Sequence, residues 1–398
     1  MTAEFSITTA RNCFPALKED QVFLDNAGGS QVLGDVIDSI SKYLYQSNVQ
    51  LGGSYRIGKQ AIERYASGYK AAAQYVNAKE DEIVIGASTT QLLLNLAVSL
   101  NFNAGDEIIL SKIDHEANID PWLHMAKRLN LSVKWWVPEG PKYELTAENL
   151  KPLISEKTKF VACTHVSNIL GTIHDVRGIS EVVHEAGALF AVDGVSFAPH
   201  RRVDVKALGV DFYAFSWYKV YGPHIALLYA STPAQRHISS LGHYFNPHTS
   251  LSDKLDLAAS NYELVQSIPL IVSYLGGSKP DPAFSAIAEH EEKLQKILLD
   301  YLNSDSRITV WGEKSGDREK RVPTISFTVA GVSSKKVVED VERTSNIGMK
   351  WGHFYSHRLC TEMLQLGEEG VVRVSMVHYN TEEEVRKVVE VLEKVLRN

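Results

Sequence analysis

The chain has few cysteines, no long hydrophobic run and no basic tract. Its three cysteines (Cys13, Cys163 and Cys360) stand at unrelated spacings, which indicates neither a disulfide framework nor a cysteine metal site. No apolar run approaches the roughly 20 residues of a membrane-spanning helix, and the N-terminal sequence lacks the apolar core of a secretory signal. The net charge is −7, from 41 basic and 48 acidic residues mixed along the chain. These features predict a soluble cytoplasmic protein with neither nucleic acid nor membrane as a partner.

Motifs of nucleotide-binding proteins and zinc proteases are also missing. No GxGxxG follows an expected strand, and no GxxxxGK[ST] occurs. His353 and His357 are four residues apart, but the glutamate that a zinc protease places between them is absent. We therefore expect no metal site.

The chain does contain enough apolar sequence for a large core. Its 398 residues are 44% hydrophobic, which is more than one domain usually holds. Short apolar runs alternate with helical patterns, as in a mainly parallel sheet covered on both faces. The expected strands are 82–87, 107–113, 132–137, 159–166, 188–194, 211–217 and 225–230. The α/β character changes near 276–282, so we predict a large domain at 21–275, with a seven-stranded sheet, and a smaller α+β cap domain from 1–20 and 276–398.

Two charged residues stand at the ends of neighbouring expected strands. Asp193 closes the run ALFAVDG, and Lys219 follows DFYAFSW. Because α/β sheets bind ligands at the carboxyl ends of their strands, we expect both at one site. A desolvated lysine can form an imine with the aldehyde of pyridoxal phosphate (PLP), and a carboxylate can keep its pyridine nitrogen protonated. Taken singly, an exposed lysine and a turn aspartate are the simpler interpretations.

Further candidates follow other expected strands, and each has a plainer alternative. Hydroxyls at a helix start suit a phosphate or a simple N-cap. A histidine can lie flat on a cofactor ring or on the surface, and an asparagine can donate to the cofactor's phenolate oxygen or stabilise a turn. An arginine in the cap can bind a substrate carboxylate or form a salt bridge. The hydroxyls are those of Ser88, Thr89 and Thr90. The histidine is His115, the asparagine is Asn168 and the arginine is Arg373.

Seven sequence blocks occur in a familiar order: VFLDNAGGS, GASTTQLLLNLA, DHEANIDPW, THVSNILGTI, AVDGVS, FSWYKVYGP and RVSMVHYNTEEEV. In this order they resemble class V aminotransferases of the cysteine-desulfurase-like group, which are PLP-dependent enzymes of fold type I. The match runs from about residue 20 to the C-terminus.

The resemblance implies a role for each candidate. Lys219 is the Schiff-base lysine, Asp193 the partner of the pyridine nitrogen, His115 the stacking ring and Asn168 a contact of the phenolate oxygen. It further implies cofactor contacts from Ser88, Thr89, Thr90, Ser196, Ser216 and Tyr218, and substrate contacts from Arg373, Asn26 and Asn168. The group is typically homodimeric, and Ser260 matches the position that reaches the partner's phosphate.

The chain departs from the group at three positions. Tyr355, in WGHFYSHRLC, stands where the persulfide-forming cysteine of desulfurases is found, and Cys360 lies five residues further on. Ser196 replaces a glutamine, and Tyr218 replaces a histidine. The cofactor site is therefore expected without the sulfur-accepting group, and Tyr355 is expected to close the pocket or relay a proton.

We predict an enzyme that acts on an α-amino acid or a derivative of one, through the external aldimine and its quinonoid. The expected reactions are elimination, replacement, decarboxylation or ring-forming C–C bond formation. The chain is similar to fungal members in specialised-metabolite pathways, such as those making loline-type alkaloids. Cysteine or selenocysteine lyase activity and aminotransfer are in-class alternatives. The alternative of another class is a non-catalytic PLP-binding regulatory protein, which would need neither Lys219 nor Arg373.

Overall fold

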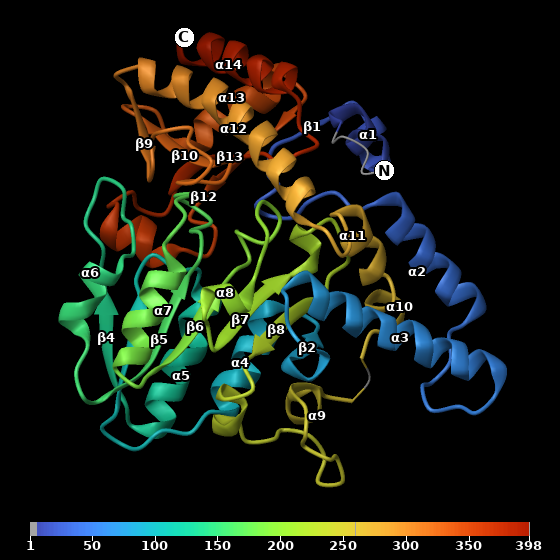
Figure 1. The fold of residues 1–398 in the computed structure, drawn as a ribbon. Coiled ribbons are helices and arrows are strands. Elements are labelled where there is room, and N and C mark those ends of the chain that lie inside the picture. Colours follow the sequence, from blue (N-terminus) through green and yellow to red (C-terminus); the bar gives the residue numbers. More distant parts are fainter. Residues whose placement is uncertain (1–5, 259, 398) are drawn as a thin grey trace.

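The computed structural model describes residues 6–258 and 260–397, and its main element is a seven-stranded sheet (Figure 1). The strand order is β2-β8-β7-β6-β5-β3-β4, and all neighbours are parallel except those that involve β8. The strands are β2 (Ile83–Gly86), β3 (Glu107–Ser111), β4 (Ser132–Trp136), β5 (Thr158–Thr164), β6 (Leu189–Asp193), β7 (Phe212–Ser216) and β8 (Ala226–Ala230). Each overlaps its predicted range, so the expected α/β fold with a mainly parallel sheet is confirmed.

Both faces of this sheet are covered, which explains why its strands are apolar throughout. Along β3, Ile108 and Leu110 belong to one core cluster and Ile109 to the other. Helices α4 and α5 add side chains to the first cluster, and α3 and α7 to the second. The helices of this part are α2 (Gly34–Gln46), α3 (Arg56–Tyr75), α4 (Thr89–Ser99), α5 (Asp120–Leu129), α6 (Ala147–Leu150), α7 (Val176–Glu185), α8 (Val205–Leu208), α9 (Leu251–Leu255), α10 (Tyr262–Val265) and α11 (Ile268–Tyr274).

The C-terminal part forms a second layer above the main sheet (Figure 1). Its four-stranded antiparallel sheet has the order β12-β13-β10-β9 and packs against three helices. The elements are α12 (Asp281–Ser304), β9 (Ile308–Trp311), β10 (Thr324–Val329), α13 (Ser334–Thr344), β11 (Ile347–Gly348), β12 (Lys350–Gly352), β13 (Val371–Ser375) and α14 (Glu382–Arg397).

Short helical turns complete the chain. They are the 3-10 turns η1 (Pro15–Lys18), η2 (Glu80–Glu82), η3 (Glu116–Asn118), η4 (Lys151–Leu153), η5 (Trp217–Lys219) and η6 (Ala234–His237), and the π-helical turn η7 (Leu359–Met363). Within the described ranges, no helix combines the length and hydropathy needed to cross a bilayer.

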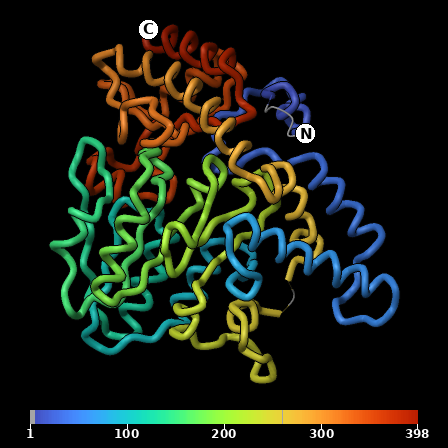
Figure 2. Tube along the Cα trace, viewed as in Figure 1, coloured from blue at the N-terminus to red at the C-terminus, as the bar shows by residue number. Residues whose placement is uncertain are grey.

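The N-terminal segment lies beside the C-terminal part (Figure 2). Strand β1 (Val22–Phe23) pairs in parallel with β11, and Val22 and Leu24 join the core of the C-terminal part. In α1 (Ile7–Asn12), Arg11 forms a salt bridge of 2.9 Å with Glu384 of α14. The large-domain range proposed from residue 21 therefore begins with residues that pack with the cap.

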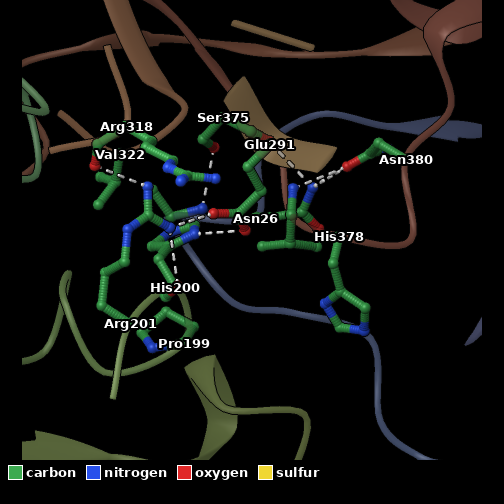
Figure 3. A network of polar contacts seen from close by, with 12 residues as sticks. Asn26, Pro199, His200, Arg201, Glu291, Arg318, Val322, Ser375, His378 and Asn380 are labelled. Carbon is green, nitrogen blue, oxygen red and sulfur yellow. Dashed lines mark hydrogen bonds and ion pairs between the residues drawn. The ribbon is translucent and has the colours of Figure 1, made fainter. Parts of the chain in front are cut away.

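A buried ion cluster joins the two parts (Figure 3). Glu291 of α12 is fully buried and lies 2.8 Å from both His200 Nδ1 and Arg201 Nη1, in the segment after β6. Arg201 also donates to the backbone carbonyl of Arg318. Burial acts to raise the pKa of Glu291, but His200 and Arg201 outweigh it and lower that pKa. The cluster thus joins the segment that follows β6 to helix α12 of the cap.

We expect Glu291→Gln to lower the free energy of unfolding by about 3–5 kcal/mol, because it leaves a buried cation without its counter-charge. Because the folded-state pKa of Glu291 is lowered, its contribution exists above the unfolded pKa and is lost as the pH falls through the folded value. The measurement is the midpoint of thermal unfolding at neutral and acidic pH. Glu292→Gln is the matched control, because Glu292 forms a surface pair with Lys296 and no other salt bridge among the described residues. Equal midpoints for the two variants would contradict this role.

Candidate active site

Two adjoining cavities lie between the carboxyl edge of the main sheet and the cap. The inner cavity, of about 500 Å³, and the outer cavity, of about 910 Å³, share His115, Asn168, Tyr218 and Lys219. The inner cavity is also lined by Ser88, Thr89, Thr90, Ala117, Thr164, Val166, Asp193, Val195, Ser196 and Ser216. The outer cavity is also lined by Ala27, Gly28, Lys350, Trp351, Gly352, His353, Phe354, Tyr355, Glu368 and Arg373.

Lys219 lies at the end of η5, directly after β7, and is buried. Desolvation, followed by the nearby charge of Arg373, lowers the pKa of its amine to about 8, although Asp193 and Asp25 act in the opposite direction. An amine with this pKa is partly neutral near pH 7, as a nucleophile must be.

Asp193 ends β6, the strand next to β7. One carboxylate oxygen accepts a hydrogen bond of 2.8 Å from the backbone N–H of Val195. Burial nevertheless raises the pKa of Asp193. A buried carboxylate in this state is stabilised by a cationic group brought into the cavity.

Hydroxyl groups gather at the start of α4. Thr89 and Ser216 lie 2.7 Å apart, and Ser88 accepts a hydrogen bond from the N–H of Gln91 as the N-cap of the helix. Ser88 is therefore an N-cap and also lines the inner cavity. Hydroxyls beside a helix N-terminus can bind a phosphate.

His115 is fixed by its own loop. Its Nδ1 accepts a hydrogen bond of 3.0 Å from the N–H of Ala117, so in the neutral ring the proton is on Nε2. Desolvation and the charges of Lys219 and Arg373 lower the pKa of His115 to about 3. The ring is thus neutral over the physiological range, and Tyr355 lies 5.3 Å from it, centroid to centroid.

Arg373 lines the outer cavity from β13 and is fully buried. Its guanidinium lies 2.7 Å from Asp25, donates to the backbone carbonyl of Asn168, and is covered by the Phe354 ring at 3.6 Å. Its Nε has no hydrogen-bond partner in the described part of the chain. Donor groups therefore remain for a carboxylate.

The loop that carries Tyr355 is strained and tied to Asn168. Phe354 and Tyr355 have φ of 48° and 61°, in the left-handed region that non-glycine residues rarely adopt. Asn168 donates to the carbonyl of Phe354 at 2.9 Å and accepts from the Ser356 hydroxyl at 2.7 Å. The Asn168 amide is thus shared between the cavities and this loop.

Two predicted site residues lie outside both cavities. The Asn26 amide donates to the carbonyls of Phe23 and Ser375, and its oxygen accepts from Tyr379. The Ser260 hydroxyl donates to Asp256. A substrate contact of Asn26 and a phosphate contact of Ser260 across a dimer both stay predictions.

Sequence reasoning missed Asp25, Phe354 and Ser356. No local pattern marks Phe354 or Ser356, because their partner Asn168 lies 186 and 188 residues away and the Phe354 ring contacts Arg373 across the fold. Asp25 pairs with Arg373, which lies 348 residues away. In VFLDNAGGS, the aspartate before the predicted Asn26 was the available signal.

The inner cavity fits PLP on its own geometry. It has hydroxyls at a helix N-terminus for a phosphate, a desolvated carboxylate for a pyridinium, and a desolvated lysine for an aldehyde. The described residues contain no cluster of three or more His, Cys, Asp or Glu arranged to hold a metal ion.

Comparisons with known proteins find relatives that match nearly the whole chain. The sequence model of the class-V aminotransferases matches residues 22–388. The aminotransferase-like protein FGM3 of Gibberella zeae is 57% identical over 99% of this chain and 100% of its own length. The cysteine desulfurase-like protein ustD of Aspergillus flavus is 39% identical over 98% of this chain and 90% of its own. The apo structure of a cysteine desulfurase from Thermococcus onnurineus NA1 superposes with a TM-score of 0.91 at 25% identity, over 100% of both chains.

We expect the amine of Lys219 in the cofactor-free protein to react half-maximally near pH 8, because desolvation lowers its pKa to about 8. The measurement is competitive acylation with a small reagent across pH, read for Lys219 by mass spectrometry. The same residue in the denatured chain gives the reference, near a pKa of about 10.4. Asp193→Asn is expected to move the midpoint lower still, since the Asp193 charge raises this pKa. A midpoint equal to that of the denatured chain would contradict the desolvated state.

Proposed function

The chain belongs to the class V aminotransferase family, whose members are PLP-dependent enzymes, and on that premise we propose that it binds PLP through Lys219 and acts on an α-amino acid or a derivative of one. The observation that carries the proposal is the placement of Lys219 and Asp193, both desolvated, on the same cavity. Bound PLP supplies an electron sink for bond changes at the substrate carbon atoms.

The inner cavity offers a partner for each part of the cofactor. Asp193 would hold the pyridine nitrogen, and the His115 ring would cover one face. The phosphate contacts would come from Ser88, Thr89, Thr90, Ser216 and Tyr218, and Ser196 would be a further cofactor contact; all of them line this cavity. The neutral state of His115 suits contact with an aromatic ring, because it adds no second charge next to Lys219.

The outer cavity would receive the substrate. Arg373 would bind the α-carboxylate through the donors that the protein leaves unused. Lys219 Nζ, with a pKa of about 8, can accept and return a proton at the substrate carbon near neutral pH. Tyr355, which is 70% exposed and lies against His115, stands at the cavity mouth, where its side chain can exclude water or relay a proton.

We propose elimination, replacement, decarboxylation or ring-forming C–C bond formation rather than persulfide transfer. Tyr355 occupies the loop position expected for a sulfur-accepting cysteine, and its phenol has no sulfur atom with which to form the S–S bond of a persulfide. Cys360 is buried in η7 and lines neither cavity, and burial raises its pKa to about 12. A thiol in that state is a poor nucleophile.

The proposal includes a fungal specialised pathway, such as alkaloid biosynthesis, and a homodimer. The first rests on the similarity to the fungal proteins FGM3 and ustD. The second is supported by large apolar side chains exposed on α2 and α3 and just before α3: Ile37, Leu44, Tyr45, Tyr55 and Ile62. In the proposed dimer Ser260 reaches the cofactor phosphate of the partner.

The direct test of cofactor binding is reduction of the purified protein with borohydride. We expect a yellow protein whose long-wavelength band is lost on reduction, with a pyridoxyl group on the peptide that contains Lys219. Lys219→Ala is the control, and it should bind the cofactor without covalent attachment. A pyridoxyl group on another lysine, or on none, would refute the proposal. Turnover across a panel of amino acids then identifies the reaction, and no turnover at all would favour a regulatory PLP-binding protein.

A second experiment tests the absence of persulfide chemistry. Wild-type protein and Cys360→Ala are assayed for sulfide release from cysteine, with and without a reductant. We expect no difference between them, because the Cys360 thiol is buried and protonated at neutral pH. We also expect Tyr355→Phe to alter turnover of the true substrate. Sulfide release that disappears in Cys360→Ala, with a persulfide on Cys360, would restore the desulfurase interpretation.

A further inference from the structure

Asp25 makes the only salt bridge of Arg373 in the described ranges, yet it does not line the outer cavity. It lines a neighbouring cavity of about 990 Å³, together with Asn26, Gly28 and Lys350. Its side chain is 32% exposed, whereas that of Arg373 is 1% exposed. The guanidinium of Arg373 therefore lies between the partly exposed carboxylate of Asp25 and the proposed substrate cavity.

The position of Asp25 is fixed by the backbone around it. Asn26 is bonded to the carbonyl of Ser375 and to Asn380, two of the contacts drawn in Figure 3. The N–H of Ala27 donates to the Ser375 hydroxyl. Gly28 leaves room for the carboxylate, because a Cβ at that position would lie 3.0 Å from Asp25 Oδ2. The hydrogen bonds of Asn26, the residue after Asp25, therefore fix the position of this turn.

We propose that Asp25 is a positioning residue that orients the Arg373 guanidinium toward the substrate carboxylate and moderates its positive charge. The inference rests on the proposed function, since it takes Arg373 as the carboxylate site. The Asp25 carboxylate, the Asn168 carbonyl and the Phe354 ring together fix the plane of the guanidinium. The unused Nε–H then has one fixed direction, as bidentate binding of a carboxylate requires.

The same carboxylate acts on the proposed cofactor lysine. Arg373 lowers the pKa of Lys219, while Asp193 and Asp25 raise it, and neutral His115 adds no charge. Removing the charge of Asp25 should therefore strengthen carboxylate binding and, at the same time, favour the neutral form of the Lys219 nitrogen. A residue that only stabilises the fold would produce neither effect.

The test uses the full chain as purified and propionate, which has a carboxylate but no amine. Asp25→Asn keeps an oxygen acceptor and removes the charge, so propionate should bind about threefold more tightly than to the wild type. The pH midpoint of the bound cofactor's absorbance change should fall. Asp25→Ala removes the acceptor as well, and propionate should bind about threefold or more weakly than to Asp25→Asn. Asp25→Glu restores the charge and should return the midpoint toward the wild-type value.

The controls separate this inference from the proposed function. Propionamide, which is uncharged, should show no gain in Asp25→Asn. Asp281→Asn breaks another aspartate–arginine pair of 2.7 Å, with Arg202, and should change nothing. If Asp25→Ala does not fold, the comparison of Asp25→Asn with Asp25→Glu decides the charge effect. Wild-type propionate affinity and midpoint in Asp25→Asn would overturn the role of Asp25 even when borohydride fixes PLP on Lys219. If no cofactor is found on Lys219, the proposed function fails, while the propionate measurements still report on Asp25.

Discussion

The amine of Lys219 and the carboxylate of Asp193 are both buried at the carboxyl edge of the main sheet. Holding charged groups out of water is costly unless partners are supplied, and the surrounding structure supplies them at fixed positions. Parallel strands β6 and β7 bring both groups to the same edge. Helices on both faces shield the apolar strands from water, and the cap covers the carboxyl edge from above. The fold thus keeps two reactive groups desolvated at one site.

The two cavities divide the chemistry between them. Lys219 and Tyr218 line both cavities. The inner cavity adds Asp193 and the departure Ser196, whereas the outer cavity adds Arg373 and the departure Tyr355. The loop of Tyr355 contains two left-handed non-glycine residues, which cost about 1–2 kcal/mol each. Contacts with Asn168 and a backbone bond from Glu116 to the Tyr355 carbonyl offset this cost. Backbone strain of this kind is typical of a segment held for function.

Much of the fold and the inner cavity could be predicted from the sequence, because the signals there are local. Apolar runs bounded by polar residues marked all the strands of the main sheet, and Asp193 and Lys219 stood at strand ends. Ser88 is the N-cap of α4, which was the plainer interpretation, and it also lines the inner cavity, where a phosphate contact was predicted. The outer cavity was less predictable, because its geometry depends on tertiary contacts. Asp25 and Arg373 are 348 residues apart, and nothing in either segment indicates the other.

That distance also explains why the N-terminal segment is part of the site. Val22 and Leu24 pack in the core of the cap, and the turn that follows them carries Asp25 to Arg373. Strand β1 can pair with β11 only when the cap has formed, and Arg373 gains its counter-charge only when β1 is in place. Because a buried guanidinium without a counter-charge is destabilising, completion of the cap and assembly of the proposed carboxylate site are energetically linked. A substitution in the first strand should therefore act on the site as well as on the cap, although it touches neither cavity.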